Sequence, residues 1–179
     1  MNQERQQDSQ GIGRGMLIAA WVLGLGLLTL LFDGALTRLV NPNGSPEGQV
    51  APDGVREVVL QRNAQGHYVA TGRINGRPVS FLIDTGATDV AVPEALADRL
   101  GLPRGPGAFS QTANGVVAVW RSQLRDVSLG PIRMHDVAAT VVPGMASGDQ
   151  VLLGMSFLKP LEMLQKDGTL TLRQAPTVP

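Results

Sequence analysis

Apolar residues form one long uninterrupted run near the start of the chain and only short, broken runs after it. The long run is "MLIAAWVLGLGLLTLLF", Met16–Phe32, and it contains no charged residue. As an α-helix it would rise about 26 Å, close to the shortest length that crosses a bilayer. No face of this helix is polar, which argues against a helix packed on the surface of a globular domain. We therefore predict a membrane-spanning segment at residues 16–32.

The charges beside this run predict its orientation. Arg5 and Arg14 precede it and Arg38 follows it, a slight excess that favours an N-terminus in the cytoplasm. We expect residues 1–15 to be a cytoplasmic lead-in and residues 16–32 to be an uncleaved signal anchor that contacts lipid of the cytoplasmic membrane. A cleaved signal peptide is the alternative. It is less favoured because the run is long for such a peptide and no A-x-A site follows it.

Polar and turn-forming residues dominate the next segment. "NPNGSPEGQVAPDG", Asn41–Gly54, is rich in Pro and Gly, a composition typical of an extended linker that does not pack. We expect residues 33–54 to be a flexible tether. The globular part is then residues 55–179, which is long enough for one small core and lies in the periplasm or outside the cell.

Short apolar or alternating runs separated by turns fill this domain. Asn75-Gly76 stands between "TGRI" and "RPVSFLI" and predicts a tight hairpin. In "VPEALADRLGLP", Pro93 suits the first turn of a helix and Gly101 suits its end, which predicts one short helix. Further strand-like runs continue to "TLTLR", Thr169–Arg173. Many short strands with one or two short helices predict an all-β fold, a small closed barrel or folded sheet.

Composition removes several classes of function. The 15 Lys and Arg residues balance the 15 Asp and Glu residues, and aromatic residues are 4% of the chain. Neither a basic face nor a stacking platform for nucleic acid is therefore expected. The chain has no Cys and two His, which excludes disulfides and thiol nucleophiles and gives no metal site of the usual kind. We expect no metal and no cofactor. Ser156 in "GMSFL" lacks the second Gly of a serine-hydrolase motif.

The candidate chemistry lies in "VSFLIDTGATDVAVP", where an apolar strand ends at Asp84. Thr85 and Thr88 supply hydroxyl groups, and Gly86 allows the backbone to approach closely and donate its N–H. Ala87 keeps the surroundings narrow. Such donors orient a carboxylate and favour its ionised form. The alternative is an Asp that only caps a turn after a strand, which is common.

A wider set of motifs favours the catalytic interpretation. "FLIDTGAT" resembles the active-site loop of retropepsin-like (clan AA) aspartic proteases. "QVLLGMSFL" is similar to a second signature of that superfamily, and "FSQTANGVVAVW" is similar to its flap hairpin. The order of the three is that of one retropepsin subunit. With the anchor, the chain resembles the bacterial membrane-anchored, single-domain type.

The resemblance implies roles for the loop residues. Asp84 would be catalytic, Thr85 would brace two paired loops across a two-fold axis, and Gly86 would donate its N–H to the carboxylate. Ala87 would keep the pocket narrow, and Thr88 would support the carboxylate from behind.

Residues outside the loop also receive roles from the resemblance. Asp89 would line the substrate groove. The segment "TLTLR" would join a sheet between two subunits, since both retropepsin termini do so. The flap residues that would cover the substrate are Thr112, Ala113, Asn114 and Gly115. The residues that would pack behind the loop are Leu152, Leu153 and Gly154.

The number of Asp-Thr-Gly motifs carries a structural consequence. Aspartic protease chemistry needs two facing carboxylates that share a proton and hold one water, and this chain has one such motif. A homodimer with two-fold symmetry would supply the second Asp84. We therefore expect an anchored endopeptidase acting on peptides or proteins. The alternative is a non-catalytic peptide-binding or assembly module with the same fold.

Overall fold

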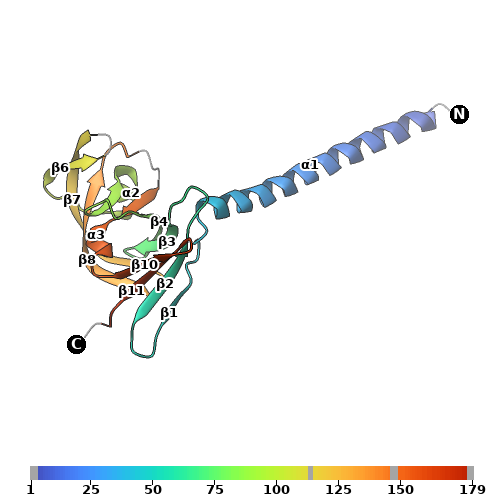
Figure 1. Ribbon diagram of the computed structural model, residues 1–179. Helices are drawn as coiled ribbons and strands as arrows, with labels where there is room; N and C mark the ends of the chain where they lie inside the picture. Colours follow the sequence, from blue (N-terminus) through green and yellow to red (C-terminus); the bar gives the residue numbers. More distant parts are fainter. Residues whose placement is uncertain (1–3, 113–114, 146–148, 177–179) are drawn as a thin grey trace. The chain divides into compact units, whose positions relative to one another are not determined.

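The computed structural model describes residues 4–112, 115–145 and 149–176 (Figure 1). The chain forms two compact units, the first ending at Leu39 and the second beginning at Val40. The first unit is a continuous helix, α1 (Glu4–Val40). Within it, residues Arg14–Phe32 are long and apolar enough to cross a membrane. This helix is consistent with a single-pass membrane anchor.

The helix is longer than the predicted span. Residues 33–40, expected as the start of a tether, are helical, and α1 ends at Val40. Pro42 explains this end because a proline ring disfavours helical geometry at the residue before it, here Asn41.

The prediction of an unpacked tether is wrong for the segment after the helix. Asn43 is 5% exposed. Its side-chain amide donates hydrogen bonds to the carbonyls of Gln61 (2.9 Å) and Val69 (2.7 Å). Strand β1 (Gly48–Val50) pairs with β2 (Arg56–Gln61). A high Pro and Gly content indicates that an isolated segment is flexible. Here the buried hydrogen bonds of Asn43 offset the conformational entropy that the segment loses when it packs.

One sheet of the second unit is open at both sides. Among the described residues its order is β1-β2-β11-β10, with β10 at Glu162–Lys166 and β11 at Thr169–Gln174. All three pairings are antiparallel. We call it the open sheet. Because β11 lies between β2 and β10, both of its edges are occupied. Within one chain, "TLTLR" therefore has no free edge for a strand of a second subunit, and its place in a sheet between subunits stays a prediction.

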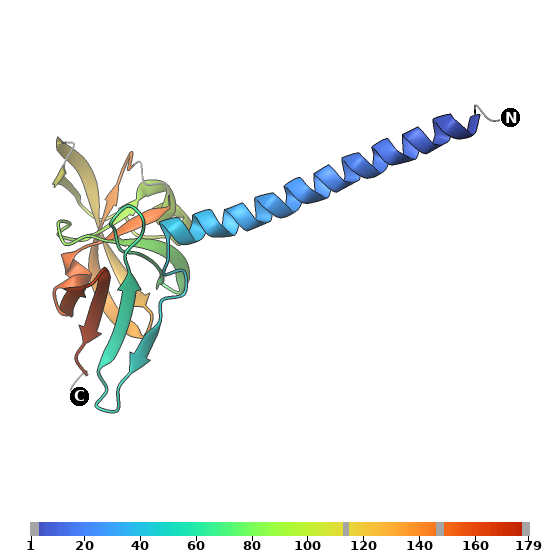
Figure 2. The ribbon, with the colours of Figure 1, turned by 45° about the vertical axis from the view of Figure 1, so that its right-hand side comes forward.

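The other sheet closes on itself, and we call it the ring. In the described part of the chain its order is β3-β4-β9-β5-β8-β7-β6. β3 also pairs with β7, through Arg73 with Ser128 and Ile74 with Val127, and this contact closes the ring. Figure 2 shows the strands of this unit turned by 45° from the view of Figure 1. β6 pairs with β7 alone. The strands are β3 (Val69–Ile74), β4 (Arg77–Ile83), β5 (Val90–Pro93), β6 (Gly107–Thr112), β7 (Gly115–Leu129), β8 (Ile132–Val142) and β9 (Gln150–Leu153). The predicted closed, mostly β fold is confirmed.

Local turn chemistry explains where the elements begin and end. Asn75 and Gly76 have φ values of 50° and 80° and join β3 to β4 as the predicted hairpin. Helix α2 (Glu94–Leu100) ends at Gly101, whose φ of 65° is left-handed. The predicted hairpin and helix are both confirmed. A second short helix, α3 (Met155–Leu158), follows β9.

The core lies inside the ring and under one face of the open sheet. Alternate residues of β4 point inward, with Val79 and Phe81 buried. Leu170 and Leu172 of β11 are buried in the same way. This period of two is what a sheet with one covered face requires. The largest fully buried side chains include Phe81, Phe157, Leu60, Ile74, Leu124, Leu129, Ile132 and Leu153.

Candidate active site

Asp84 lies where two parallel strands of the ring end. β4 runs parallel to β9, with Phe81 opposite Val151 and Ile83 opposite Leu153. The chain continues this pairing for one residue, since the Asp84 N–H donates to the Leu153 carbonyl at 3.2 Å. Asp84 is half-buried. The ring therefore places the Asp84 carboxylate where the C-terminal ends of β4 and β9 lie side by side.

The loop orients this carboxylate with its own backbone. The Gly86 N–H donates to Asp84 Oδ1 at 2.9 Å, and the Ala87 N–H donates to the Asp84 carbonyl at 3.3 Å. A side chain at position 86 would come within 3.2 Å of Oδ1. Within the described part of the chain, Oδ2 of Asp84 has no hydrogen-bond partner. One oxygen is thus held and the other is open to a reactant.

Helix α3 holds the loop from behind. The N–H groups of Met155 and Ser156 donate to the carbonyls of Ala87 (2.8 Å) and Thr88 (2.9 Å). A Cβ on Gly154 would lie 2.2 Å from the Asp89 carbonyl oxygen, so a side chain there would displace the loop. Gly154 lies directly behind the loop, as the resemblance implies. Leu153 is buried and Leu152 is half-buried beside it.

Ser156 has a positioning function that the sequence analysis missed. Its hydroxyl donates to the Ala138 carbonyl at 2.7 Å and accepts the Val90 N–H at 3.0 Å. It therefore connects α3 to β8 and to the strand that follows the loop. The sequence feature that could have indicated this function is a hydroxyl residue two positions after Gly154, in the first turn of a helix. We had weighed Ser156 only as a nucleophile.

The two loop threonines lie at the surface of the described chain. Thr85 and Thr88 are exposed, and neither hydroxyl makes a hydrogen bond to any residue that the structure describes. The expected support of Asp84 by Thr88 is thus not made within one chain, where the Gly86 N–H supplies the contact. Asp89 is half-buried and faces Gly154 through its carbonyl oxygen.

The hairpin of β6 and β7 is the candidate flap. Its pairing runs from Gly107 opposite Trp120 to Thr112 opposite Gly115. The predicted tip residues Ala113 and Asn114 lie outside the described residues. One face of the hairpin carries Phe109, 82% exposed, and Val116, 62% exposed. The candidate flap thus exposes apolar side chains.

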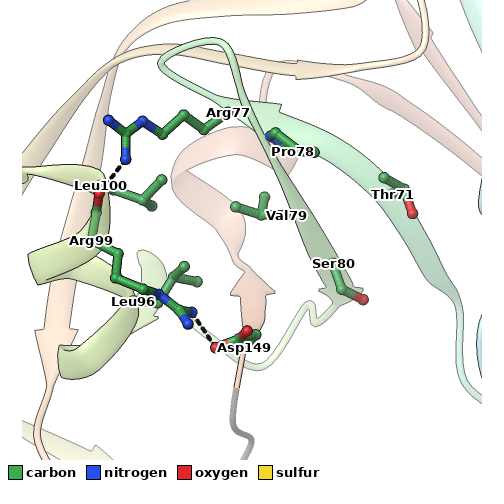
Figure 3. A pocket seen from close by; sticks show the side chains of 9 residues that line it. All are labelled: Thr71, Arg77, Pro78, Val79, Ser80, Leu96, Arg99, Leu100 and Asp149. Atoms are coloured by element: carbon green, nitrogen blue, oxygen red, sulfur yellow. Dashed lines mark hydrogen bonds and ion pairs between the residues drawn. The ribbon is translucent and has the colours of Figure 1, made fainter.

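A hollow of about 450 Å³ lies at the opposite end of β4 from Asp84 (Figure 3). Its apolar lining includes Pro78 and Val79. The Arg77 guanidinium donates to the Arg99 carbonyl, and the Arg99 guanidinium pairs with Asp149. Both arginine side chains of the lining therefore already have partners. No lining residue belongs to the Asp84 loop, so this hollow is separate from the candidate active site. Among the described residues no group of three or more His, Asp or Glu is placed to hold a metal.

Comparison with protein families gives a match over residues 70–160 to the family described as "gag-polyprotein putative aspartyl protease". The chain belongs to this family. The matched residues of this family member include the Asp84 loop, both strands of the candidate flap and Gly154. They do not include β10 or β11.

Similar proteins extend this assignment. An uncharacterised protein encoded in the cobV 5′ region of a Sinorhizobium species is 42% identical over 118 residues, covering 63% of this chain and 49% of the relative. An uncharacterised protein of Rickettsia prowazekii is 30% identical over 108 residues, covering 59% and 46%. This aspartyl protease family member therefore spans about half the length of the curated relatives it matches.

A solved structure resembles the fold. The crystal structure of a retropepsin-like aspartic protease from Rickettsia conorii aligns with a TM-score of 0.56 and 24% identity. The alignment covers 73% of this chain and 96% of that one. The fold of this family member is therefore retropepsin-like.

Proposed function

We propose that the protein is a membrane-anchored aspartic endopeptidase in which two copies each contribute Asp84. The observation that carries this proposal is the geometry of the loop. One carboxylate oxygen is held by the Gly86 N–H while the other has no partner among the described residues. α3 fixes the loop through two backbone hydrogen bonds. A turn that only ends a strand has no need for such support.

The chemistry follows from two such carboxylates sharing one proton and one water. The ionised Asp84 takes a proton from the water, whose oxygen forms a bond to the carbonyl carbon of the peptide. The protonated Asp84 of the other copy donates its proton to the carbonyl oxygen. The first Asp84, which now carries the proton of the water, donates it to the amine nitrogen, and the second Asp84 takes the proton of one hydroxyl of the tetrahedral intermediate. The C–N bond breaks, which leaves a carboxylic acid and an amine. The carboxylates return to their starting state, and no cofactor takes part.

Placement relative to the membrane completes the proposal. α1 anchors the enzyme in the cytoplasmic membrane with its N-terminus inside, and the catalytic domain is periplasmic or extracellular. Thr85, whose hydroxyl is exposed in one chain, braces the loop of the second copy. Confinement to the membrane raises the effective concentration of the two copies and favours their association.

The decisive experiment measures peptide cleavage by the full chain in detergent micelles. Asp84→Asn should reduce cleavage of a fluorogenic peptide library to background, because the amide can neither accept nor donate the shared proton. Asp136→Asn is the matched control. Asp136 is exposed and has a φ of 55°, which Asn tolerates, so its cleavage should be unchanged. Equal cleavage by Asp84→Asn and the unmodified chain would overturn the proposal, and so would peptide binding without cleavage by the unmodified chain.

A further inference from the structure

The connection between the apolar part of α1 and the globular unit is short. The apolar part ends at Phe32, and the helix continues to Val40. As a helix, residues 33–40 add a rise of about 12 Å. A fully extended tether over residues 33–54, as the sequence led us to expect, would span roughly 75 Å. The catalytic unit therefore has much less reach from the membrane than the Pro and Gly content of this segment suggests.

Hydrogen bonds hold the first residues of the globular unit in place. The Asn63 side-chain amide donates to the Val40 carbonyl at 2.9 Å, and Asn63 is 8% exposed. The Asn41 side-chain amide donates to the Thr71 hydroxyl at 3.0 Å. Asn43, two residues later, is buried by the contacts described above. The segment that follows α1 is therefore part of the packed domain and cannot extend without breaking these bonds.

A short path through the ring leads from this attachment to the candidate active site. Asn43 forms a bridge with Ala70 of β3, and its carbonyl accepts the Thr71 N–H at 3.0 Å. Ala70 lies opposite Phe81 of β4, and Asp84 follows three residues after Phe81. Neighbouring strands lie about 5 Å apart and a strand rises about 3.3 Å per residue, so the Asp84 Cα lies within about 20 Å of the Asn43 Cα.

These lengths limit the distance between Asp84 and the end of the apolar segment, whatever the orientation of the domain. From Phe32 to Asn43 the chain spans at most about 23 Å, because most of it is helical. With the path through the ring, the Asp84 Cα can lie no more than about 45 Å from the Phe32 Cα. An extended tether would have allowed about twice this distance.

We propose that this limit selects the substrates: the enzyme cleaves peptide bonds within about 45 Å of the apolar core of the membrane, in the membrane-proximal segments of proteins anchored in the same membrane. This inference rests on the proposed function. An anchored substrate meets the limit over about its first 13 residues beyond the membrane, even when these are fully extended. Confinement to one membrane also raises the effective concentration of enzyme and substrate, which a soluble protein does not gain.

Reporter substrates of graded height test the limit directly. The full chain is reconstituted into vesicles of phosphatidylethanolamine and phosphatidylglycerol together with a single-pass reporter. In each reporter an (EAAAK)n spacer, about 1.5 Å per residue where helical, separates the membrane helix from the peptide that the library experiment finds to be cleaved best. Spacers of about 15 and 30 Å should permit rapid cleavage, and spacers of about 60 and 90 Å should slow it at least fivefold.

A longer connection in the enzyme should move this limit outward. A Gly/Ser linker of about 40 residues, inserted between Phe32 and Asp33, adds a root-mean-square length of about 35 Å. This variant should cleave the reporter with the 60 Å spacer nearly as fast as the one with the 30 Å spacer. The matched control carries the same linker ahead of α1, where it leaves the reach unchanged, and should keep the original preference. Both variants should cleave the free peptide in detergent micelles as fast as the unmodified chain does.

Energy transfer measures the height of the domain without any cleavage. The chain contains no Cys, so Gln65→Cys carries a single donor dye. Gln65 is exposed and lies three residues before Tyr68, whose carbonyl accepts the N–H of Ile83, the neighbour of Asp84. Transfer to acceptor-labelled lipids in the same vesicles should be strong for this variant. The linker between Phe32 and Asp33 should reduce it at least twofold, and the linker ahead of α1 should leave it unchanged.

The outcomes separate this inference from the proposed function. Cleavage that depends on Asp84 but is equally fast for all four spacers would overturn the inference and leave the protease proposal standing. So would an inserted linker that changes neither the spacer preference nor the energy transfer, or faster cleavage of the same peptide on a soluble protein than on the shortest reporter. If the unmodified chain cleaves neither the reporters nor any peptide of the library, the proposed function falls, and this inference falls with it.

Discussion

The ring and the open sheet differ in how their strands are held, since the ring closes on itself and leaves only β6 outside the closure among the described residues. The ring closes where β3 meets β7, and its residues near Asp84 are locked by backbone hydrogen bonds. The open sheet leaves the outer edges of β1 and β10 without a strand in the described part of the chain. The closed region therefore fixes the geometry of the Asp84 loop, and the open region leaves two strand edges unpaired among the described residues.

The largest effect should come from crowding the point where the ring closes. A Cβ on Gly72 would lie 2.4 Å from the Ser128 carbonyl oxygen and 2.5 Å from the Phe81 ring. β3 is held on both sides, by β4 and β7, so it cannot move away. Gly72→Ala should lower the free energy of unfolding by about 3 kcal/mol or more. Urea denaturation of the full chain in detergent, followed by circular dichroism, measures this change.

A glycine of the open sheet provides the matched control. A Cβ on Gly48 would lie 2.2 Å from Pro131 Cδ. However, β1 has β2 as its only strand partner among the described residues and can shift outward. Gly48→Ala should therefore cost only about 1 kcal/mol. Equal losses at the two glycines would contradict the distinction between a closed and an open region.

The next effect concerns Asn43, which joins the two regions. It accepts the Gln61 N–H of β2 at 2.7 Å and donates to the Val69 carbonyl of β3. Asn43→Ala leaves these buried groups unpaired and should lower the free energy of unfolding by about 2–4 kcal/mol. Asn41→Ala, which loses two part-buried bonds, one to the Thr71 hydroxyl and one from the Asn43 N–H, should cost about 1 kcal/mol. Thermal unfolding of both variants compares them, and a larger loss at position 41 would contradict this role.

The smallest effect is a pH dependence confined to the open sheet. The Arg173 guanidinium, 2.5 Å from Glu57 Oε2, lowers the pKa of the Glu57 carboxyl. A lowered pKa in the folded state stabilises the fold above the unfolded pKa, and this contribution disappears as the pH falls through the folded value. The pair is partly exposed, so Glu57→Gln should cost less than about 1 kcal/mol near neutral pH. As the pH falls through the lowered pKa of Glu57, the stabilities of the variant and the unmodified chain should converge. A gap that widens in this direction would contradict the assignment.

Features set by neighbouring residues could be predicted from the sequence. The hairpin at Asn75-Gly76 and the limits of α2 depend on local turn chemistry, and the structure has both. The motif around Asp84 was recognisable because it occupies consecutive positions. The closed, mostly β class followed from many short strands bounded by turns.

Features that depend on distant partners could not be predicted. Asn43 is buried where its amide donates hydrogen bonds to the Gln61 and Val69 carbonyls. The residues around Asn43 in the sequence do not indicate which distant residues would be its partners. β11 is interior because β2 pairs with it, although its sequence also suits an edge strand. Likewise, the support that Ser156 gives to β8 needs a fold in which Ala138 is near.

The pairing of the Asp84 loop with residues far downstream has a consequence for biosynthesis. The groups that hold the loop belong to Leu153, Met155 and Ser156, which leave the ribosome long after Asp84 does. A nascent chain whose α1 has already emerged therefore has no fixed carboxylate until most of the domain has followed. Translation itself thus delays the point at which the Asp84 loop acquires its final geometry.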